Sequence, residues 1–288
     1  MVKTVLITGA TDGIGKHLAK KLASQGHHVI LHGRNPQKLE LSLQEVRAVS
    51  LRGKVSSYLA DFSKLDDVYR FVEEIKQDFQ SIDVLFNNAG LYAGKKRKAS
   101  AENVELTFML SVLVPYILTT ELSSLLEKSA DGRVINTSSY MHHFAKVKDL
   151  DFGFENDYNP GLAYNNSKLY TIWMTRYLAR DFFLSSSSIT VNSYHPGLIS
   201  TNLGNNSSDE KTKKSLFGRF MKSLSKDLDE GIETGYYLTL SEEIKGLTGY
   251  YFDEKKVKSA SEKGYNFEKA QDLITYCDDK IKLFQTKQ

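Results

Sequence analysis

Tyr164 and Lys168 are the two residues whose types and spacing best suit chemistry in this chain of 288 residues. They lie four positions apart in a segment, residues 163–183, with a helical pattern, so both side chains are predicted on one helical face. A phenol ionises at about pH 10, and a neighbouring ammonium lowers that pKa because it stabilises the phenolate. Such a pair could exchange a proton with a carbonyl or alcohol oxygen at neutral pH. Since most Tyr-x-x-x-Lys pairs are surface contacts, the remaining sequence must decide between the two interpretations.

A glycine-rich turn, residues 9–15, follows the β-branched run 3–8 and precedes a helical pattern. A strand, a glycine turn and a helix in this order are the context of a dinucleotide-binding fingerprint. Gly9 would permit the tight turn, Gly13 would let the backbone approach the pyrophosphate, and Gly15 would let the helix pack closely. The free N–H groups of the helix would then hold the phosphates. An ordinary glycine turn is the alternative.

Strand-like and helical segments alternate along the chain. The later predicted strands are residues 28–32, 55–59, 84–87, 134–137 and 189–194, and predicted helices include 37–49, 67–79 and 266–283. This alternation favours one α/β domain over residues 1–288, a doubly wound parallel sheet of the Rossmann type covered on both faces. Such a sheet binds ligands beyond the carboxyl ends of its strands. The candidate residues that directly follow strands are Gly9, Arg34, Asp61, Asn88, Ser139 and Pro196.

Four motifs occur in an order that resembles the short-chain dehydrogenase/reductase family over nearly the whole chain. They are Thr8–Gly15, Asn87–Gly90, Asn136–Ser139 with Tyr164–Lys168, and Pro196-Gly197. Within the family the chain is most similar to the retinol dehydrogenase-like branch of carbonyl reductases. The residues that carry this closer resemblance are Val134–Ser139 leading to His142-His143, Gly161–Tyr164, and His195–Gly197.

The resemblance implies a catalytic role for four residues. Tyr164 would transfer the proton, and Lys168 would lower its pKa and hold the nicotinamide ribose. Ser139 would position the substrate oxygen, although the adjacent Ser138 competes, since side chains alternate along a strand and only one of the two should face the site. Ser111 stands where the family usually carries an asparagine that holds a water of the proton relay. Its hydroxyl could bind that water or simply bond its own helix.

The resemblance also implies a set of residues that bind the cofactor. The set comprises Gly9, Thr11, Asp12, Gly13, Ile14, Gly15, Arg34, Asn35, Asp61, Phe62, Asn88, Ala89, Gly90, Tyr164, Lys168, Pro196, Gly197, Ile199 and Thr201. Within it, Asp61 would contact the adenine, Asn88 would lie near the adenosine ribose, and Thr201 would meet the nicotinamide amide or the pyrophosphate.

Charge after the second strand predicts which cofactor is used. A carboxylate there would bind a ribose 2′-hydroxyl and repel a 2′-phosphate. Arg34 offers a guanidinium fork that suits phosphate, and Asn35 could assist it. We therefore expect NADP(H), even though Asp12 stands where some NADP-using relatives place a basic residue.

Two segments would enclose the substrate. Residues 202–226 are polar, with apolar side chains at helical spacing. The resemblance implies that a mobile flap at about 200–228 covers the substrate. A surface amphipathic helix is the alternative. The loop Phe144 to Gly161 would form the other wall. Its candidate pocket aromatics are Phe152, Phe154 and Tyr158.

Composition narrows the partners and the compartment. The balance of 38 basic and 35 acidic residues predicts no nucleic-acid partner. The basic run Lys95–Lys98 reads as a solvated loop, with attraction of an anionic substrate or nuclear localisation as alternatives. A single cysteine, Cys277, predicts no internal disulfide and fits a reducing cytoplasm. No metal site, signal peptide or membrane-spanning run is evident, so we expect a soluble cytoplasmic protein, and the resemblance implies a homo-oligomer, a dimer or tetramer.

The predicted activity is reduction of a ketone or aldehyde carbonyl by NADPH, since cells usually keep that cofactor reduced. The substrate would be a small molecule or a peptide. The Lys-, Asn- and Ser-rich composition is typical of low-GC bacteria, in which relatives of this branch reduce the N-terminal 2-oxopropionyl cap of a lantibiotic peptide to a lactyl cap. Oxidation of retinol or another lipid alcohol is an alternative. A non-catalytic NADP-sensing regulator is a further one, although such regulators typically lose Tyr164 or Lys168.

Overall fold

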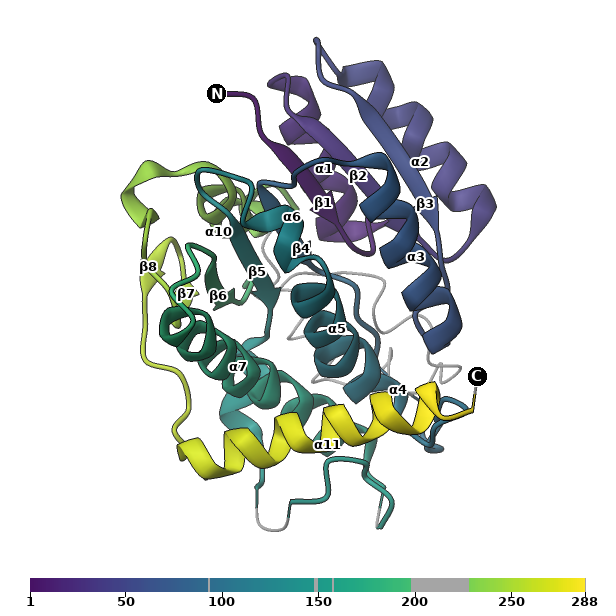
Figure 1. Cartoon of the computed structure of the whole chain (residues 1–288), viewed down its shortest axis with the longest axis vertical. Helices are drawn as coiled ribbons and strands as arrows, with labels where there is room; N and C mark the ends of the chain where they lie inside the picture. The colour runs from purple at the N-terminus through teal and green to yellow at the C-terminus, as the bar shows by residue number, and fades with distance from the viewer. Residues whose placement is uncertain (93, 148–149, 157, 198–227, 288) are drawn as a thin grey trace, which may run out of the picture.

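The computed structural model describes residues 1–92, 94–147, 150–156, 158–197 and 228–287. In this part of the chain an eight-stranded sheet has the order β3-β2-β1-β4-β5-β6-β7-β8 (Figure 1). The strands are β1 (Thr4–Ile7), β2 (His28–Gly33), β3 (Val55–Leu59), β4 (Val84–Asn87), β5 (Arg133–Thr137), β6 (Thr190–Tyr194), β7 (Tyr251–Asp253) and β8 (Lys256–Val257). All neighbouring pairs are parallel except β7 and β8. The predicted α/β fold with a doubly wound parallel sheet is confirmed.

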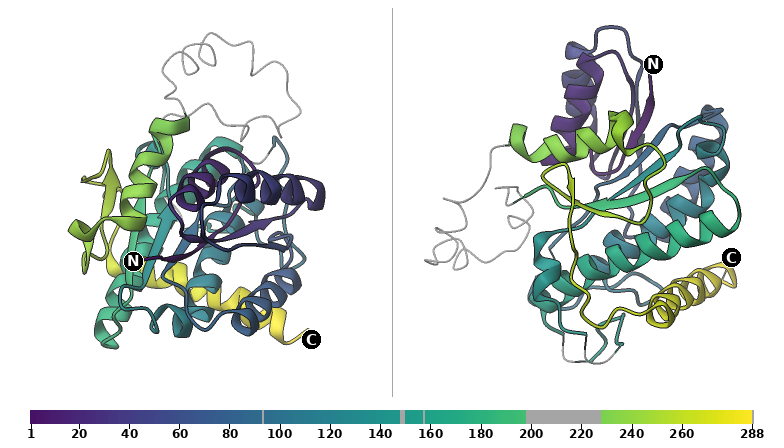
Figure 2. Two further views of the ribbon diagram at one scale, coloured as in Figure 1. Left: turned by 90° about the horizontal axis from the view of Figure 1, so that it is seen from above. Right: turned by 90° about the vertical axis from the view of Figure 1, so that its left-hand side faces the viewer.

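Helices cover both faces of the sheet. One layer holds α1 (Gly13–Ser24), α2 (Pro36–Val49) and α10 (Leu228–Leu240), and the other holds α3 (Leu65–Asp78), α5 (Val114–Glu121) and α7 (Pro160–Leu184). The last helix, α11 (Phe267–Gln285), packs on the outer side of α7, away from the sheet (Figure 2). The shorter helical segments are α4 (Leu106–Phe108), η1 (Met109–Leu113), α6 (Ser123–Leu126), η2 (Tyr140–Phe144) and η4 (Glu242–Ile244).

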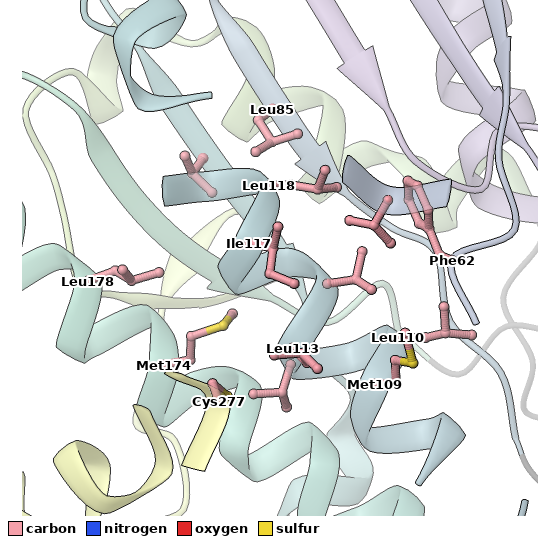
Figure 3. Packing of buried hydrophobic residues seen from close by; sticks show 14 of the residues in the cluster. Phe62, Leu85, Met109, Leu110, Leu113, Ile117, Leu118, Met174, Leu178 and Cys277 are labelled. Atoms are coloured by element: carbon pink, nitrogen blue, oxygen red, sulfur yellow. The ribbon is translucent and has the colours of Figure 1, made fainter. Parts of the chain in front are cut away.

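Strand side chains divide the core in two, because successive residues point to opposite faces. Leu6 belongs to the cluster under α3, α5 and α7, whereas Val5 and Ile7 belong to the cluster under α1, α2 and α10. Figure 3 shows part of the first cluster, which includes Cys277 of α11 and Met174 of α7. Burying a large apolar side chain of this kind contributes about 1.5–3 kcal/mol.

The strand order reverses at β1, which pairs with β2 on one side and with β4 on the other. The register brings the strand ends level there, since Ile7 lies opposite both Leu31 and Phe86. Ligands of doubly wound sheets bind beyond the carboxyl ends of the strands at such a reversal. The fold therefore places the glycine turn after β1 at the expected crevice. Residues 200–227 of the predicted flap lie outside the described residues, as do the predicted cofactor residues Ile199 and Thr201.

Candidate active site

Helix α7 carries Tyr164 and Lys168 one turn apart, as predicted. It begins at Pro160, and the Asn159 side chain caps it by accepting a hydrogen bond from the Leu162 N–H at 3.0 Å. Lys168 Nζ lies 5.7 Å from the centre of the Tyr164 ring. The helix thus presents a phenol and an ammonium on the same face.

Lys168 is almost fully buried, at 5% exposure, and this burial lowers its pKa to about 8. Its ammonium donates a hydrogen bond to the carbonyl oxygen of Thr137, at the end of β5, at 2.9 Å. The Lys168 side chain is therefore held between the helix and the sheet.

Burial raises the pKa of Tyr164, while a side-chain hydrogen bond with Ser139 opposes the rise and Tyr92 adds to it. The net pKa shift of Tyr164 is thus upward rather than downward as expected, because burial outweighs the hydrogen bond with Ser139. Stabilisation of the Tyr164 phenolate by Lys168 stays a prediction. The predicted acid and the predicted oxygen-positioning hydroxyl of Ser139 nevertheless lie close enough to interact.

Ser138 and Ser139 point in different directions, as neighbours beyond a strand should. The Ser138 hydroxyl is buried and donates to the carbonyl oxygen of Lys168 at 2.8 Å. Ser139 faces Tyr164 and also accepts a hydrogen bond from the Met141 N–H at 3.3 Å, which starts η2. Of the two serines, Ser139 is the one next to the phenol, while Ser138 fastens the strand to α7.

Ser111 lies in η1, a five-residue π-helical turn that packs on α7. Its carbonyl oxygen accepts a hydrogen bond from the Thr171 hydroxyl at 3.0 Å. Its own hydroxyl is buried and has no hydrogen-bond partner among the described residues. A π-turn inside a helix often marks a functional site. The hydroxyl therefore keeps the capacity to bind a water, and its role in a proton relay stays a prediction.

The glycine turn is packed against the end of β4. Gly9 has a φ of 66°, and a β-carbon on it would lie 2.9 Å from the Ala89 Cα, so a side chain there is excluded. A β-carbon on Gly15 would lie 2.6 Å from Asn88 Nδ2. That amide donates to the carbonyl oxygens of Thr8 and Gly9 at 3.0 and 3.2 Å. Asn88 thus fixes the turn against β4.

A cavity of about 490 Å³ opens at this crevice. It is lined by Gly9, Thr11, Asp12, Gly13, Ile14, His32, Gly33, Arg34, Asn35, Lys38, Asp61, Phe62, Asn88, Ala89, Gly90, Leu91 and Leu110. Most residues of the predicted cofactor set are therefore brought together. Gly15 lies beneath the glycine turn. Gly90 lies next to the catalytic pair, since a β-carbon on it would be 3.8 Å from Lys168 Nζ, so the cavity reaches Lys168 at this residue.

The charged end of this cavity contains Arg34, which is exposed, and Lys38. Asn35 caps α2, since its side chain accepts a hydrogen bond from the Lys38 N–H at 2.9 Å. The Asp12 carboxylate likewise accepts from the Gly13 N–H at 2.8 Å at the start of α1. The sequence reasoning missed Lys38, although its place one turn into the helix after Arg34 could have indicated it.

Pro196 and Gly197 lie apart from the first cavity, in a second hollow with His195, Glu233 and Asp253 among its lining residues. The Gly197 N–H donates to His195 Nδ1 at 2.9 Å, and His195 Nε2 lies 2.9 Å from an Asp253 carboxylate oxygen. Their predicted contact with the cofactor stays a prediction.

The predicted aromatic wall is only partly visible among the described residues. Phe152 and Phe154 are buried in the core cluster, where Phe152 packs on Tyr170 at 5.2 Å, and neither lines the crevice cavity; their place in a substrate pocket stays a prediction. Tyr158 is half-buried and donates a hydrogen bond to the buried Glu105 carboxylate at 3.4 Å. Tyr92, which was not predicted, lies next to Tyr164 with ring centres 5.5 Å apart. Apolar loop residues fill either a core or a pocket, and the sequence pattern does not separate the two.

The basic run is partly structural. Arg97 donates to the carbonyl oxygen of Gly153 at 3.0 Å and to the Asn103 side chain at 2.7 Å, so its charge ties two loops together. In the described part of the chain no helix is long and apolar enough to cross a bilayer. The same residues contain no cluster of three or more His, Cys, Asp or Glu that could hold a metal ion.

Comparisons with known proteins agree with this geometry. The short chain dehydrogenase family matches residues 3–212. Human retinol dehydrogenase 14 is 33% identical over 267 residues, which cover 88% of this chain and 79% of that protein. Mouse retinol dehydrogenase 13 is 31% identical over 276 residues, covering 95% and 82%. The chain belongs to the short-chain dehydrogenase/reductase family, and its relatives include retinol dehydrogenases.

Solved structures share the fold. An uncharacterized protein from Mycobacterium paratuberculosis has a TM-score of 0.75 at 24% identity, covering 97% of this chain and 93% of that one. RhlG from Pseudomonas aeruginosa, solved as an NADP active-site complex, has a TM-score of 0.68 at 20% identity, covering 87% and 93%. As a member of the short-chain dehydrogenase/reductase family, the protein is an oxidoreductase, and this family uses a nicotinamide cofactor.

Proposed function

We propose that this protein is an NADPH-dependent reductase that converts a ketone or aldehyde carbonyl to an alcohol. The observation that carries the proposal is the arrangement of Tyr164 next to Ser139 and, one helical turn away, the buried Lys168, whose Nζ lies 5.7 Å from the centre of the Tyr164 ring. Gly90 connects this group to the crevice cavity, since it lines the cavity and a β-carbon on it would lie 3.8 Å from Lys168 Nζ. A binding cavity and an acid–base group thus meet at the switch point of the sheet.

The residues present fit a nicotinamide dinucleotide. The glycine turn and the start of α1 would hold the pyrophosphate, Arg34 and Lys38 a 2′-phosphate, and Lys168 the nicotinamide ribose. When bound, the cofactor supplies the hydride.

The chain's own residues do the rest of the chemistry. Ser139 holds the substrate oxygen by a hydrogen bond, and Tyr164 gives that oxygen its phenolic proton. Lys168 stabilises the phenolate that remains, because an ammonium favours the charged form of a neighbouring acid.

The preference for NADP(H) rests on charge. Arg34 and Lys38 lie where the adenosine ribose would bind, and no carboxylate follows β2 directly. RhlG and a short chain dehydrogenase from Shigella flexneri were solved with NADP, which supports the same choice. A guanidinium and an ammonium beside the ribose would favour a cofactor with one more phosphate.

Oxidation of retinol or another lipid alcohol is the second candidate. The relatives favour it, since they include retinol dehydrogenases and the human polyprenol dehydrogenase, which is 32% identical over 263 residues. The lantibiotic 2-oxopropionyl peptide has no support from these relatives. YwfH, an NADPH-dependent reductase involved in bacilysin biosynthesis, shares the fold at a TM-score of 0.70 and 21% identity. Peptides belong in a substrate screen because they are among the substrates expected from the sequence.

The experiment follows NADPH absorbance with a panel of ketones, aldehydes, 2-oxoacyl peptides and retinaldehyde, and NADP⁺ reduction with retinol. Tyr164→Phe should abolish turnover and still bind NADPH. Tyr177→Phe is the matched control, because it removes a hydroxyl from the same helix at a ring that stacks on Phe267. Undiminished turnover in Tyr164→Phe would refute the proposed acid. NADPH binding without turnover of any substrate would favour the alternative of a non-catalytic NADP-sensing regulator.

A further inference from the structure

His32 lies at the end of β2, immediately before the Gly33-Arg34 pair. Its side chain is 3% exposed, yet the residue lines the crevice cavity. The Gly9 N–H lies 3.1 Å from His32 Nδ1, and the carbonyl oxygen of Ala60 lies 3.0 Å from Nε2. An amide N–H can only donate and a carbonyl oxygen can only accept. The ring must therefore be neutral, with its proton on Nε2 and an acceptor lone pair on Nδ1.

These bonds join three segments that come together only in the folded chain. Besides the ring's bond to Gly9, the backbone oxygen of His32 accepts from the Ala10 N–H at 2.8 Å, so His32 receives two successive amides of the glycine turn. The imidazole also stacks on Phe62, with ring centres 3.7 Å apart and planes at 9°. The glycine turn, the end of β2 and the end of β3 are thus connected through one side chain.

We propose that His32 is a positioning residue for the adenosine half of the cofactor. It holds Gly9 in the left-handed conformation that the turn needs, and it sets the distance between the glycine turn and the segment Ala60–Phe62 across the cavity. Histidine is suited to this place because its ring offers an acceptor on one side and a donor on the other. The inference rests on the proposed binding of a nicotinamide dinucleotide and holds for NADPH and NADH alike.

His32→Phe tests the inference, because phenylalanine keeps the size of the ring and its stack on Phe62 but leaves the Gly9 N–H without an acceptor. A buried donor without a partner is costly, so the Kd for NADPH should rise about tenfold or more, with kcat at saturating NADPH unchanged. His28→Phe is the matched control, since it makes the same substitution at the start of the same strand. NADPH bound by His32→Phe as tightly as by the wild type, or equal losses in both variants, would overturn the inference.

A second comparison measures the NADPH affinity of His32→Asn and His32→Gln. It also tests the inference if His32→Phe does not fold. The short Asn side chain places an acceptor near the Nδ1 position, whereas Gln reaches the Nε2 position and can only replace the donor to Ala60. Asn should therefore recover NADPH affinity better than Gln, at matched melting temperatures. Equal affinities, or the reverse order, would refute the role assigned to His32. A wild-type protein that bound neither NADPH nor NADH would instead refute the proposed function.

Discussion

Lys168 donates a hydrogen bond from its ammonium to the carbonyl oxygen of Thr137 at 2.9 Å, which connects α7 to the end of β5. Ser138 makes the reverse connection, since its hydroxyl donates to the carbonyl oxygen of Lys168 at 2.8 Å. The two bonds fix the helix against the strand that leads to Ser139. The position of the ammonium is thus set by the sheet as well as by its spacing from Tyr164.

The protonation of Lys168 predicts how activity depends on pH. Burial lowers its pKa to about 8, so the ammonium is lost as the pH rises through that value. The kcat/KM for carbonyl reduction should therefore fall above about pH 8, because a neutral amine neither holds the ribose as well nor stabilises a phenolate. Lys168→Arg, whose guanidinium stays charged, should be less active but should lack this fall. A wild-type profile that stays level far above pH 8 would contradict the assignment.

Arg34→Ala should weaken NADPH binding far more than NADH binding. Hydrogen bonds to a charged group contribute about 1.5–3 kcal/mol, so the KM for NADPH should rise about tenfold to a hundredfold. Lys38→Ala should have a smaller effect in the same direction. Arg52→Ala is the control, because Arg52 is exposed and lies outside the cavity. Steady-state kinetics with both cofactors provide the measurement, and equal losses for NADPH and NADH in Arg34→Ala would argue against a 2′-phosphate site.

Packing of α11 predicts a contrast between two leucines of the same helix. Leu273 is fully buried against the core, whereas Leu283 is 41% exposed. Leu273→Ala should lower the free energy of unfolding by about 2–5 kcal/mol, because it leaves a cavity. Leu283→Ala should change it by less than about 0.5 kcal/mol. Urea unfolding measures both, and similar values for the two would show that α11 does not pack as described.

Two buried histidines predict acid sensitivity of the fold. Burial lowers the pKa of His32 and of His142 from 6.5 to about 4. Between these values the unfolded chain binds more protons than the folded one, so the free energy of unfolding falls as the pH falls from about 6.5 to about 4. The slope is at most about 1.4 kcal/mol per pH unit for each histidine.

Chemical denaturation at several pH values measures this slope. His142→Asn and His32→Asn should each be less stable near neutral pH but should lose less stability on acidification. An unchanged slope in both variants would assign the acid sensitivity to other groups.

Local patterns made the helix of Tyr164 and Lys168 and the glycine turn predictable from the sequence, since spacing and glycine chemistry decide both. The raised pKa of Tyr164 was not predictable, because it depends on burial by distant segments. His32 was hidden for a similar reason, as its partners Gly9 and Ala60 lie in other elements. The short strands β7 and β8 were also missed, because three and two residues carry no periodicity.

The expected homo-oligomer stays a prediction. Helix α11 covers the outer side of α7, and its Asp278 accepts a hydrogen bond from Tyr116 of α5 at 2.9 Å. A dimer whose subunits pair through α5 and α7 would therefore include α11 in its interface. Light scattering measures the oligomeric state.

Thr8 and Asn88 fasten the two halves of the sheet to each other at the crevice. The Thr8 hydroxyl accepts from the Asn88 and Ala89 N–H groups, each at 2.9 Å, and the Asn88 amide returns a bond to the Thr8 carbonyl at 3.0 Å. Spreading the half-sheets would break all three bonds at once. The bonds between Thr8 and the Asn88-Ala89 segment would therefore oppose any change in the width of the crevice when a nucleotide enters or leaves it.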